Sequence, residues 1–321
     1  MRNVLQNQDR LCSLDEALAS IVDRHPPIKD IATAYALLHK ARQAVTQALP
    51  PVSLLGQAPG TTTLALGLPL LGELMDALAT PSPELVARLR TAARLVLPAA
   101  IQAFPMLAEG LTQVAERLDD EAGAGDALAT ALVAAVGPSA EPGSMEQLAA
   151  DLGLEATALH VAATESLLAI LTHEAGLLIG LVDHNVWRRP HCPVCGGLPD
   201  VGILKEGMED SEFLVAKAGQ LWLHCGQCAA LWRSTRLRCL SCGSEDPKDL
   251  DILLIEGDQR AEQEQAHLCK ACMTYTTTVN MVDRLDRLNL EMLAMRLLPL
   301  ELLAQERGYA PLAPSPWNKL S

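Results

Sequence analysis

Aromatic residues are scarce in this chain, which has two Phe, three Tyr and four Trp among its 321 residues. Before Trp187 only Tyr35 and Phe104 occur. A core in this part must be built from leucine, alanine and valine, which suits closely packed helices, whereas strands favour aromatic and β-branched residues. The first 186 residues are therefore predicted to form an all-α helical bundle.

Positive charge is also in short supply. The chain has 25 basic and 39 acidic residues and a net charge of -14. Binding to a phosphate backbone requires clustered lysine and arginine. Nucleic acid is therefore disfavoured as the main partner.

Long apolar runs are missing as well. The N-terminal sequence MRNVLQNQDRLC has no apolar segment behind its first basic residue, so no secretory signal is expected. The longest apolar stretch, Leu167 to Val182, is interrupted by His173 and Glu174 and is predicted to fall short of a membrane span. We therefore expect no membrane span and a cytoplasmic location. In that reducing compartment, cysteines are expected as metal-bound thiolates rather than disulfides.

The chain lacks the common catalytic motifs. It has no phosphate-binding P-loop, no Gly-x-Gly-x-x-Gly, no Gly-x-Ser-x-Gly and no convincing pair of carboxylates. His173 and Glu174 begin like a His-Glu-x-x-His zinc helix, but position 177 is Leu. His173, His160 and His184 are therefore interpreted as structural. We predict no catalytic residue and no enzyme activity.

Capping residues mark several helix starts. Ser13 with Glu16 forms a capping box, and Ser82 before Pro83 is a typical N-cap. The helix that Ser82 begins is predicted to reach about Leu97, because Pro98 lacks the N–H group that would continue it. A long helix is expected from Glu155 to about Asn185.

Against these absences, cysteine is concentrated in one stretch. Eight of the nine cysteines lie within 81 residues as four Cys-x-x-Cys pairs, with 29, 10 and 26 residues between successive pairs. Such a turn directs two sulfurs toward one point, and two turns supply the four thiolates of a tetrahedral metal site. The predicted ligands are Cys192, Cys195, Cys225 and Cys228 in site 1, and Cys239, Cys242, Cys269 and Cys272 in site 2.

This division assumes that neighbouring pairs share an ion. Sequential pairing closes short hairpin loops, which costs less entropy than the long loops of an interleaved, cross-braced arrangement, so it is favoured. Cys-Pro-Val-Cys also resembles a thioredoxin-like redox pair, but four copies favour metal binding over redox dithiols or disulfides. His191, His224 and His267 lie close to the pairs, yet four sulfurs leave them unneeded. Cys12 is expected to be a free thiol.

The composition changes at Trp187, where short β-like runs begin. These runs are Gln220 to His224, Leu231 to Leu237, Asp251 to Glu256 and Tyr275 to Met281. Strands that alternate with cysteine turns are typical of zinc ribbons and rubredoxins. The chain is therefore predicted to be α+β, with a helical domain at 1–186, a first four-cysteine module at 187–236, a second at 237–281, and a C-terminal helix and tail at 282–321.

Each module is expected to hold one Fe or Zn ion, because both metals suit four sulfurs. Four thiolates leave a net charge of about -2 around Zn²⁺ and about -1 around Fe³⁺. Arg233, Arg236 and Arg238 lie between the modules and could balance that charge. A solvated strand face is an equally good interpretation of these arginines.

The residues around the cysteines carry a family resemblance. The order CPVCGG at 192–197, LWLHCGQC at 221–228, then LW, RLRC and CLSCGS up to position 244, and a fourth pair followed by Tyr275 resembles the formate dehydrogenase accessory protein family, FdhE. Residues 305–309 and Pro316-Trp317 resemble that family's C-terminal end, after a helix expected from Asp283 to about Leu298. Leu231, Thr277 and the longer gap after the first pair depart from the family pattern.

The resemblance implies a non-catalytic, cytoplasmic maturation factor of chaperone type. Such a protein binds the catalytic subunit of a molybdenum or tungsten formate dehydrogenase, and the family suggests rubredoxin-like iron in the two sites. Two other classes stay open on the residues alone. One is a rubredoxin-like electron carrier or redox sensor. The other is a zinc-ribbon nucleic-acid binder, for which Trp232 and the three arginines would form a small basic, aromatic strand face.

Overall fold

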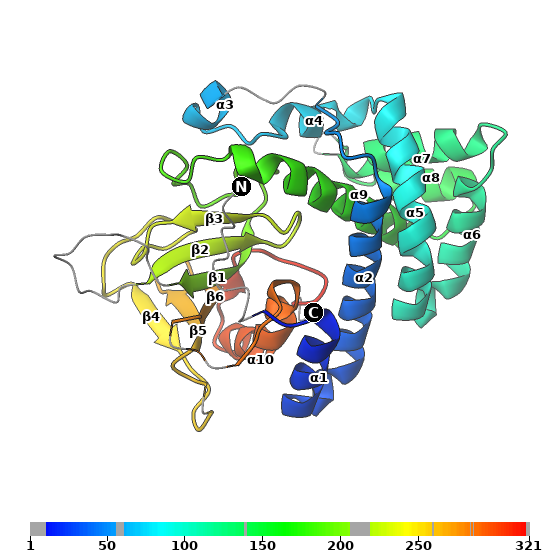
Figure 1. Ribbon diagram of the computed structural model, residues 1–321. Helices are drawn as coiled ribbons and strands as arrows, with labels where there is room; N and C mark the ends of the chain where they lie inside the picture. The colour runs from blue at the N-terminus through cyan, green and yellow to red at the C-terminus, as the bar shows by residue number, and fades with distance from the viewer. Residues whose placement is uncertain are drawn as a thin grey trace. The chain divides into compact units, whose positions relative to one another are not determined.

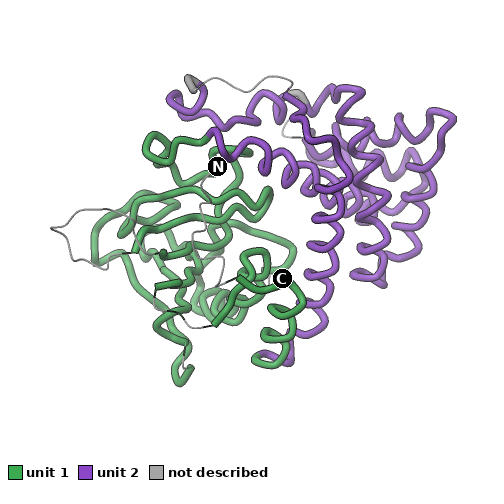
Figure 2. The backbone as a smooth tube through the Cα atoms, viewed as in Figure 1, with its two compact units in different colours: residues 1–24, 182–321 green, residues 25–181 purple. Residues whose placement is uncertain are grey.

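The computed structural model describes residues 11–55, 61–137, 140–205, 219–258, 260–282, 284 and 286–318. It contains two compact units, which Figure 2 colours separately. His25–Leu181 forms one unit, and Met1–Arg24 together with Val182–Ser321 forms the other. The first is helical, and the second combines a seven-stranded sheet with helices. The predicted α+β class is confirmed.

The helical unit has the aromatic-poor core that its composition predicts. Its helices are α2 (Lys29–Ala48), α3 (Thr61–Ala65), α4 (Gly72–Asp76), α5 (Pro83–Ala103), α6 (Ala108–Leu118), α7 (Ala124–Val136), α8 (Ser144–Leu152) and α9 (Ala156–Leu178). Helices α2, α5 and α9 pack against one another. Leu38, Leu89, Leu132 and Leu159, one from each of four helices, are fully buried.

Helix α5 begins where the sequence predicts and ends later. The backbone N–H of Leu85 donates to Ser82 Oγ at 3.2 Å, which caps the first turn. The predicted end near Leu97 is wrong, because α5 continues through Pro98 to Ala103. Pro98 and Arg94, whose carbonyl loses its helical donor, both lie on the exposed side of the helix. Water can therefore satisfy the carbonyl that the proline leaves unpaired.

Buried charges fix the loop after α2. Glu174 on α9 is fully buried and accepts from Arg88 at 2.8 Å and from the Ser53 hydroxyl at 2.6 Å. The ring nitrogens of His173 lie 3.2 Å from the carbonyl oxygen of Thr46 and 2.9 Å from that of Pro50. His173 and Glu174 thus hold the chain that leaves α2, which is the structural role predicted for His173.

One segment of the described residues is long and apolar enough to cross a membrane by length and composition. It covers Ala156–Leu181, and 56% of its most apolar window is buried inside the protein. The bent helix pair Pro83–Ala103 and Pro105–Leu118 passes the test together. The buried core helix of a globular unit passes the same test, so neither segment by itself indicates a membrane span.

The second unit is built on a mixed sheet (Figure 1). Six strands have the order β3-β2-β1-β6-β5-β4, and β7 pairs with β6. Their bounds are β1 Pro199–Lys205, β2 Gln220–Cys225, β3 Leu231–Ser234, β4 Leu250–Leu253, β5 Glu264–Cys269, β6 Thr274–Asn280 and β7 Ala310–Pro311. Strands β1 to β3 form one antiparallel half and β4 to β6 the other.

The two halves join through the parallel pairing of β1 with β6, which runs from Val201 opposite Thr277 to Leu204 opposite Asn280. Gly202 permits this close approach. A Cβ at Gly202 would come within 2.9 Å of Thr278 Oγ1. Each predicted module therefore contributes three strands to one continuous sheet rather than forming a separate sheet of its own.

Helix α10 (Leu293–Glu306) lies against β5 and β6 (Figure 1). The apolar core there includes Val201, Ile203, Tyr275 and Val279 from the strands and Leu293, Leu297 and Leu300 from the helix. The helix predicted from Asp283 to about Leu298 is displaced, because α10 begins at Leu293 and continues past Pro299. Residues 283 and 285 lie outside the described residues.

The N-terminal segment belongs to the sheet-containing unit. Leu11 forms a parallel bridge with Leu288, and the backbone N–H of Cys12 donates to Leu288 O at 2.9 Å. Helix α1 (Leu14–Arg24) follows with its predicted capping box, in which Ser13 N donates to Glu16 Oε2 at 2.8 Å. The domain range 1–186 predicted from the sequence places this segment with the helical bundle, whereas these contacts tie it to the C-terminal residues.

A buried charge network completes that attachment. Glu264 accepts from Arg24 at 2.5 Å, from Arg284 at 2.6 Å and from Arg296 at 2.6 Å. Asp286 accepts from Arg284 and Arg296, and Asp258 pairs with Arg24. The network joins α1, β5, the segment before α10 and α10 itself. Because Glu264, Arg284 and Arg296 are buried, each depends on the others for compensation.

We predict that Glu264→Ala lowers the free energy of unfolding by about 3–5 kcal/mol, because it leaves three arginines without their shared buried carboxylate. Denaturant unfolding of the full chain, followed by fluorescence, measures this. Glu262→Ala is the matched control, since Glu262 is exposed two residues away in the chain. Equal unfolding midpoints for the two variants would contradict a stabilising role for the network.

Glu301 on α10 generates a pH prediction. The side chain is buried, and burial raises its pKa to about 7. Hydrogen bonds with Asn318 and Tyr275 lower the pKa, but burial has the larger effect. Between the unfolded pKa of about 4.3 and this value, the folded state binds more protons. Stability from this group is therefore lost as pH rises through that window, by on the order of 3 kcal/mol.

Glu301→Gln removes the titration. We expect the unfolding free energy of this variant, relative to the native chain, to increase as pH rises from 5 to 8 and then to level off. Urea unfolding at several pH values measures the difference. Glu306→Gln, on the exposed side of the same helix, should keep the native profile. A constant difference between Glu301→Gln and the native chain would contradict the proposed protonation.

Candidate metal centres

A structural repeat positions the eight cysteines. In the first half of the sheet, the order is a Cys-x-x-Cys turn, β1, β2, a second turn and β3. The second half repeats this order with β4, β5 and β6. The turn before the first strand and the turn between the last two strands then converge. Cys195 thus corresponds to Cys242, and Ala230 corresponds to Thr274.

The four sulfurs of site 1 lie together and are buried. Cys192 Sγ is 3.6 Å from Cys228 Sγ, and Cys195 Sγ is 3.5 Å from Cys225 Sγ. None of the four residues is more than 7% exposed. Backbone N–H groups of Val194 and Gly197 each donate to a cysteine sulfur at 3.4 Å.

Site 2 has similar sulfur spacing and a different environment. Cys239 Sγ is 3.6 Å from Cys272 Sγ, and Cys242 Sγ is 3.7 Å from Cys269 Sγ. Cys239 and Cys269 are buried, Cys272 is half-buried and Cys242 is exposed. The hydroxyl of Thr274 lies 3.0 Å from Cys272 Sγ. The structure therefore groups the sulfurs as sequential pairing predicts.

These groups fit a metal ion. All ligand atoms within each group lie within 4.8 Å of one another. A tetrahedral ion with metal–sulfur bonds of about 2.3 Å places its sulfurs about 3.8 Å apart, close to the spacing here. A disulfide needs about 2.05 Å, far below any of these distances. The donor set suits Zn²⁺ or iron and does not select between them.

The four turns share one backbone conformation. In each turn the fifth residue donates its N–H to the carbonyl of the first cysteine, at distances from 2.8 to 3.0 Å. These fifth residues are Gly196, Ala229, Gly243 and Met273, and all have positive φ, from +56° to +81°. Ala229 and Met273 adopt this conformation at a cost of roughly 1–2 kcal/mol each. The sequence shows glycine at the fifth position of only two turns, so the shared conformation of all four turns could not be predicted from glycine alone.

The neighbouring histidines are placed outside the sulfur groups. His224 Nδ1 lies 2.7 Å from Asp200 Oδ1. Burial lowers the pKa of His224, but Asp200 outweighs it and raises the value to about 9. His191 packs edge-on against Trp187, and the His267 side chain is exposed on β5. Cys12 is also free and lies outside both groups.

The predicted structural histidines of the long helix differ in their surroundings. His160 is exposed on α9. His184 lies beyond that helix, with its ring edge-on to Trp222 at a centroid distance of 4.9 Å. Among the described residues, neither of them joins a group of metal-ligating side chains.

The arginines between the modules have separate contacts. Arg236 Nη1 donates to the carbonyl oxygen of Gly219 at 2.9 Å. Arg238 lies against the site 2 turn, because a Cβ at Gly243 would come within 2.9 Å of its Nη2. Its Nε is also 3.9 Å from Glu245 Oε1. Arg238 therefore lies beside the second cysteine of this turn, Cys242, which precedes Gly243.

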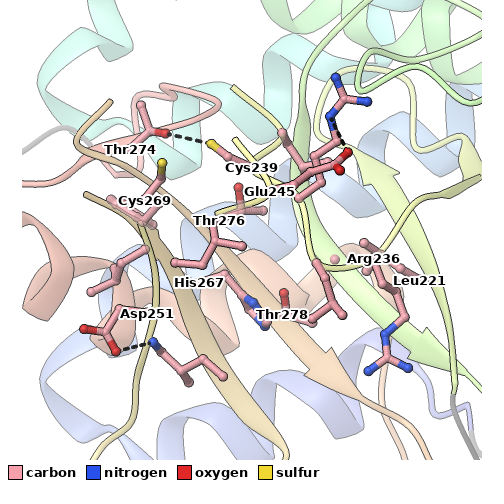
Figure 3. A pocket seen from close by; sticks show the side chains of 18 of the residues that line it. Leu221, Arg236, Cys239, Glu245, Asp251, His267, Cys269, Thr274, Thr276 and Thr278 are labelled. Atoms are coloured by element: carbon pink, nitrogen blue, oxygen red, sulfur yellow. Dashed lines mark hydrogen bonds and ion pairs between the residues drawn. The ribbon is translucent and has the colours of Figure 1, made fainter. Parts of the chain in front are cut away.

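A cavity of about 410 Å³ adjoins site 2 on one face of the sheet (Figure 3). Cys239 and Cys269 form part of its wall, with Thr274, Thr276 and Thr278 from β6. Leu237 and Ile252 also line it, and their side chains are 80% and 51% exposed. One side of site 2 thus faces a largely apolar hollow rather than packed protein.

Sequence reasoning missed several residues that shape the sites. Thr274 contacts the sulfur of Cys272, and Asp200 contacts the ring of His224. Both contacts depend on strand register, which the sequence alone does not give. A repeat of turn, two strands, turn and strand could have predicted these contacts. The repeat is hard to recognise in the sequence, because β1 contains Gly202 and β5 reads EQAHLC, which has little β-branched or aromatic character.

No protein-family model matches the chain. Among curated proteins, it is 30% identical over 128 residues to the "Protein FdhE homolog" of Aquifex aeolicus (strain VF5), covering 40% of this chain and 41% of that protein. It is 31% identical over 91 residues to the FdhE homolog of Haemophilus influenzae (strain PittEE), covering 28% and 26%. The matches thus span less than half of these relatives' length.

A solved structure shares the fold. The crystal structure of the FdhE protein from Pseudomonas aeruginosa aligns with a TM-score of 0.53 and 22% sequence identity. The alignment covers 94% of this chain and 93% of that one. The similarity of fold therefore includes the helical unit, in which the sequence has no motif that resembles the family.

We predict that Gly197→Ala weakens metal binding at site 1 by about 1–3 kcal/mol, because the new methyl group would crowd the sulfur. A Cβ there would lie 3.2 Å from Cys225 Sγ and 2.7 Å from Gln227 Oε1. Competition with a chromophoric chelator measures the affinity of each ion. Gly180→Ala is the control, since a Cβ at Gly180 meets nothing within 4 Å. Unchanged affinity in Gly197→Ala would contradict this crowding.

Proposed function

We propose, on the premise that the sequence and fold matches support membership of the FdhE family, that this chain is an accessory protein for formate dehydrogenase maturation. It would bind the catalytic subunit in the cytoplasm, before final assembly or export, without catalysing a reaction itself. The observation that carries the proposal is the combination of FdhE-named relatives with two intact four-cysteine groups.

The metal centres serve this function as scaffold. Cys192, Cys195, Cys225 and Cys228 would hold one ion, and Cys239, Cys242, Cys269 and Cys272 the other. Bound Zn²⁺ supplies a structural crosslink worth on the order of 10 kcal/mol, and iron adds one-electron chemistry. The protein's own part is to fix the sulfurs through the four turns and through the backbone N–H groups directed at them.

A rubredoxin-like electron carrier or redox sensor is the second candidate. The exposure of Cys242 favours it, because electron transfer requires a cluster near the surface. Absorption spectra of protein purified with and without oxygen would separate an iron centre from a zinc scaffold. The third candidate, a zinc-ribbon nucleic-acid binder, needs an exposed aromatic side chain on the strand face. Trp232 does not provide it, because it is fully buried and donates to Arg189 O at 3.1 Å.

We predict that the tagged full chain recovers the formate dehydrogenase catalytic subunit from cells that make the enzyme, with and without oxygen. Mass spectrometry of the eluate identifies the subunit, and cells carrying the tag alone provide the control. Tagged Glu262→Ala should recover as much subunit as the native chain. Failure to recover the subunit under both oxygen regimes would contradict the proposed client.

A further inference from the structure

The two centres repeat the same turns and strands, but they differ in solvent access. At site 1 every cysteine is buried, with at most 7% exposed. At site 2 Cys242 is exposed, and Cys272 is half-buried. Cys242 and Cys195 occupy the same place in the repeat. The difference therefore comes from what covers each turn rather than from the turn itself.

Two tryptophans cover the chain that enters site 1. Trp187 Nε1 donates to His191 O at 2.9 Å, and Trp232 Nε1 donates to Arg189 O at 3.1 Å. Both indoles are at most 1% exposed. They fix the residues immediately before Cys192, so opening site 1 would expose large apolar side chains. No described residue plays that part before Cys239, where residues 235–238 are exposed.

Site 2 is open on two sides. Ser241 and Cys242 face solvent at the tip of one turn, and Met273 is 42% exposed at the other. The cavity adjoins the same cluster through Cys239 and Cys269 (Figure 3). A chelator or thiol reagent can therefore approach the sulfurs without unfolding the sheet.

The sulfurs also differ in their hydrogen bonds. The Thr274 hydroxyl lies 3.0 Å from Cys272 Sγ, whereas Ala230 occupies the matching position in site 1. Hydrogen bonding to a thiolate stabilises its charge and, with solvent exposure, tunes a metal–sulfur centre. At Cys272, site 2 thus differs from site 1 both in hydrogen bonding and in exposure.

We propose that site 2 is an exchange and modification site, whose metal can leave and whose Cys242 and Cys272 can be alkylated in the folded protein, while site 1 is a permanent structural centre. This rests on the metal-binding part of the proposed function and not on the client. In a cell, the metal supply would then act on site 2 alone.

Timed metal release tests this in the full chain carrying two Zn²⁺ ions. EDTA is added with iodoacetamide, zinc release is followed with time, and alkylated cysteines are mapped by mass spectrometry. Each alkylation forms one S–C bond and releases iodide. We expect one ion to leave at least tenfold faster than the other, with label on Cys242 and Cys272 before any site 1 cysteine. Release at one common rate, or earlier label in site 1, would overturn the proposal.

The repeat offers matched variants. Cys242→Ser should lose the rapidly released ion and keep the tightly held one, whereas the equivalent Cys195→Ser should keep only the rapidly released ion. The native-chain experiment decides the matter even where Cys195→Ser does not fold. A chain that takes up no metal would overturn the centres themselves and this division with them. Failure to recover the client would leave the division standing.

Discussion

Four sulfur atoms brought within 4.8 Å of one another set the plan of the C-terminal unit. Thiolates at that distance repel unless a cation or shared protons compensate them, and their positions must be enforced by the backbone. Each cluster therefore requires two turns with a residue of positive φ, and each pair of turns requires strands of matching register. The repeat of turn, two strands, turn and strand meets that requirement twice.

Two such assemblies could have remained separate small modules. They are joined instead, because Gly202 lets β1 approach β6 and the two halves share the core against α10. The two clusters therefore lie on one continuous sheet, but they differ in exposure, because the cysteines of site 1 are buried and Cys242 of site 2 is exposed.

Much of this could be predicted from the sequence. The FdhE resemblance is confirmed by the matches to FdhE-named proteins, and the α+β class is confirmed by the structure. The grouping of sulfurs followed from loop length alone. That the groups hold metal remains a prediction. Capping at Ser13 and Ser82 was also correct, because caps depend on residues only three positions apart.

The features that the sequence did not predict depend on contacts between residues far apart in the chain. Strands β1 and β5 have weak local signals and are held by pairing with β2, β4 and β6. Pro98 does not end α5, because tolerance of a proline depends on which side of the helix faces water. The unequal burial of Cys195 and Cys242 has no local signal at all. In the folded chain Cys195 Sγ lies 3.8 Å from Gln227 Oε1, whereas Cys242 faces solvent.

The attachment of α1 to Glu264 has a consequence for synthesis on the ribosome. Arg24 and its partner Glu264 are 240 residues apart, so the first helix emerges long before the strand that neutralises it. The helical unit between them can fold in that interval, since units generally fold as they emerge. The sheet unit closes only when translation is nearly complete. A chain released early would carry Arg24 without Asp258 and Glu264, the two carboxylates with which it pairs in the finished protein.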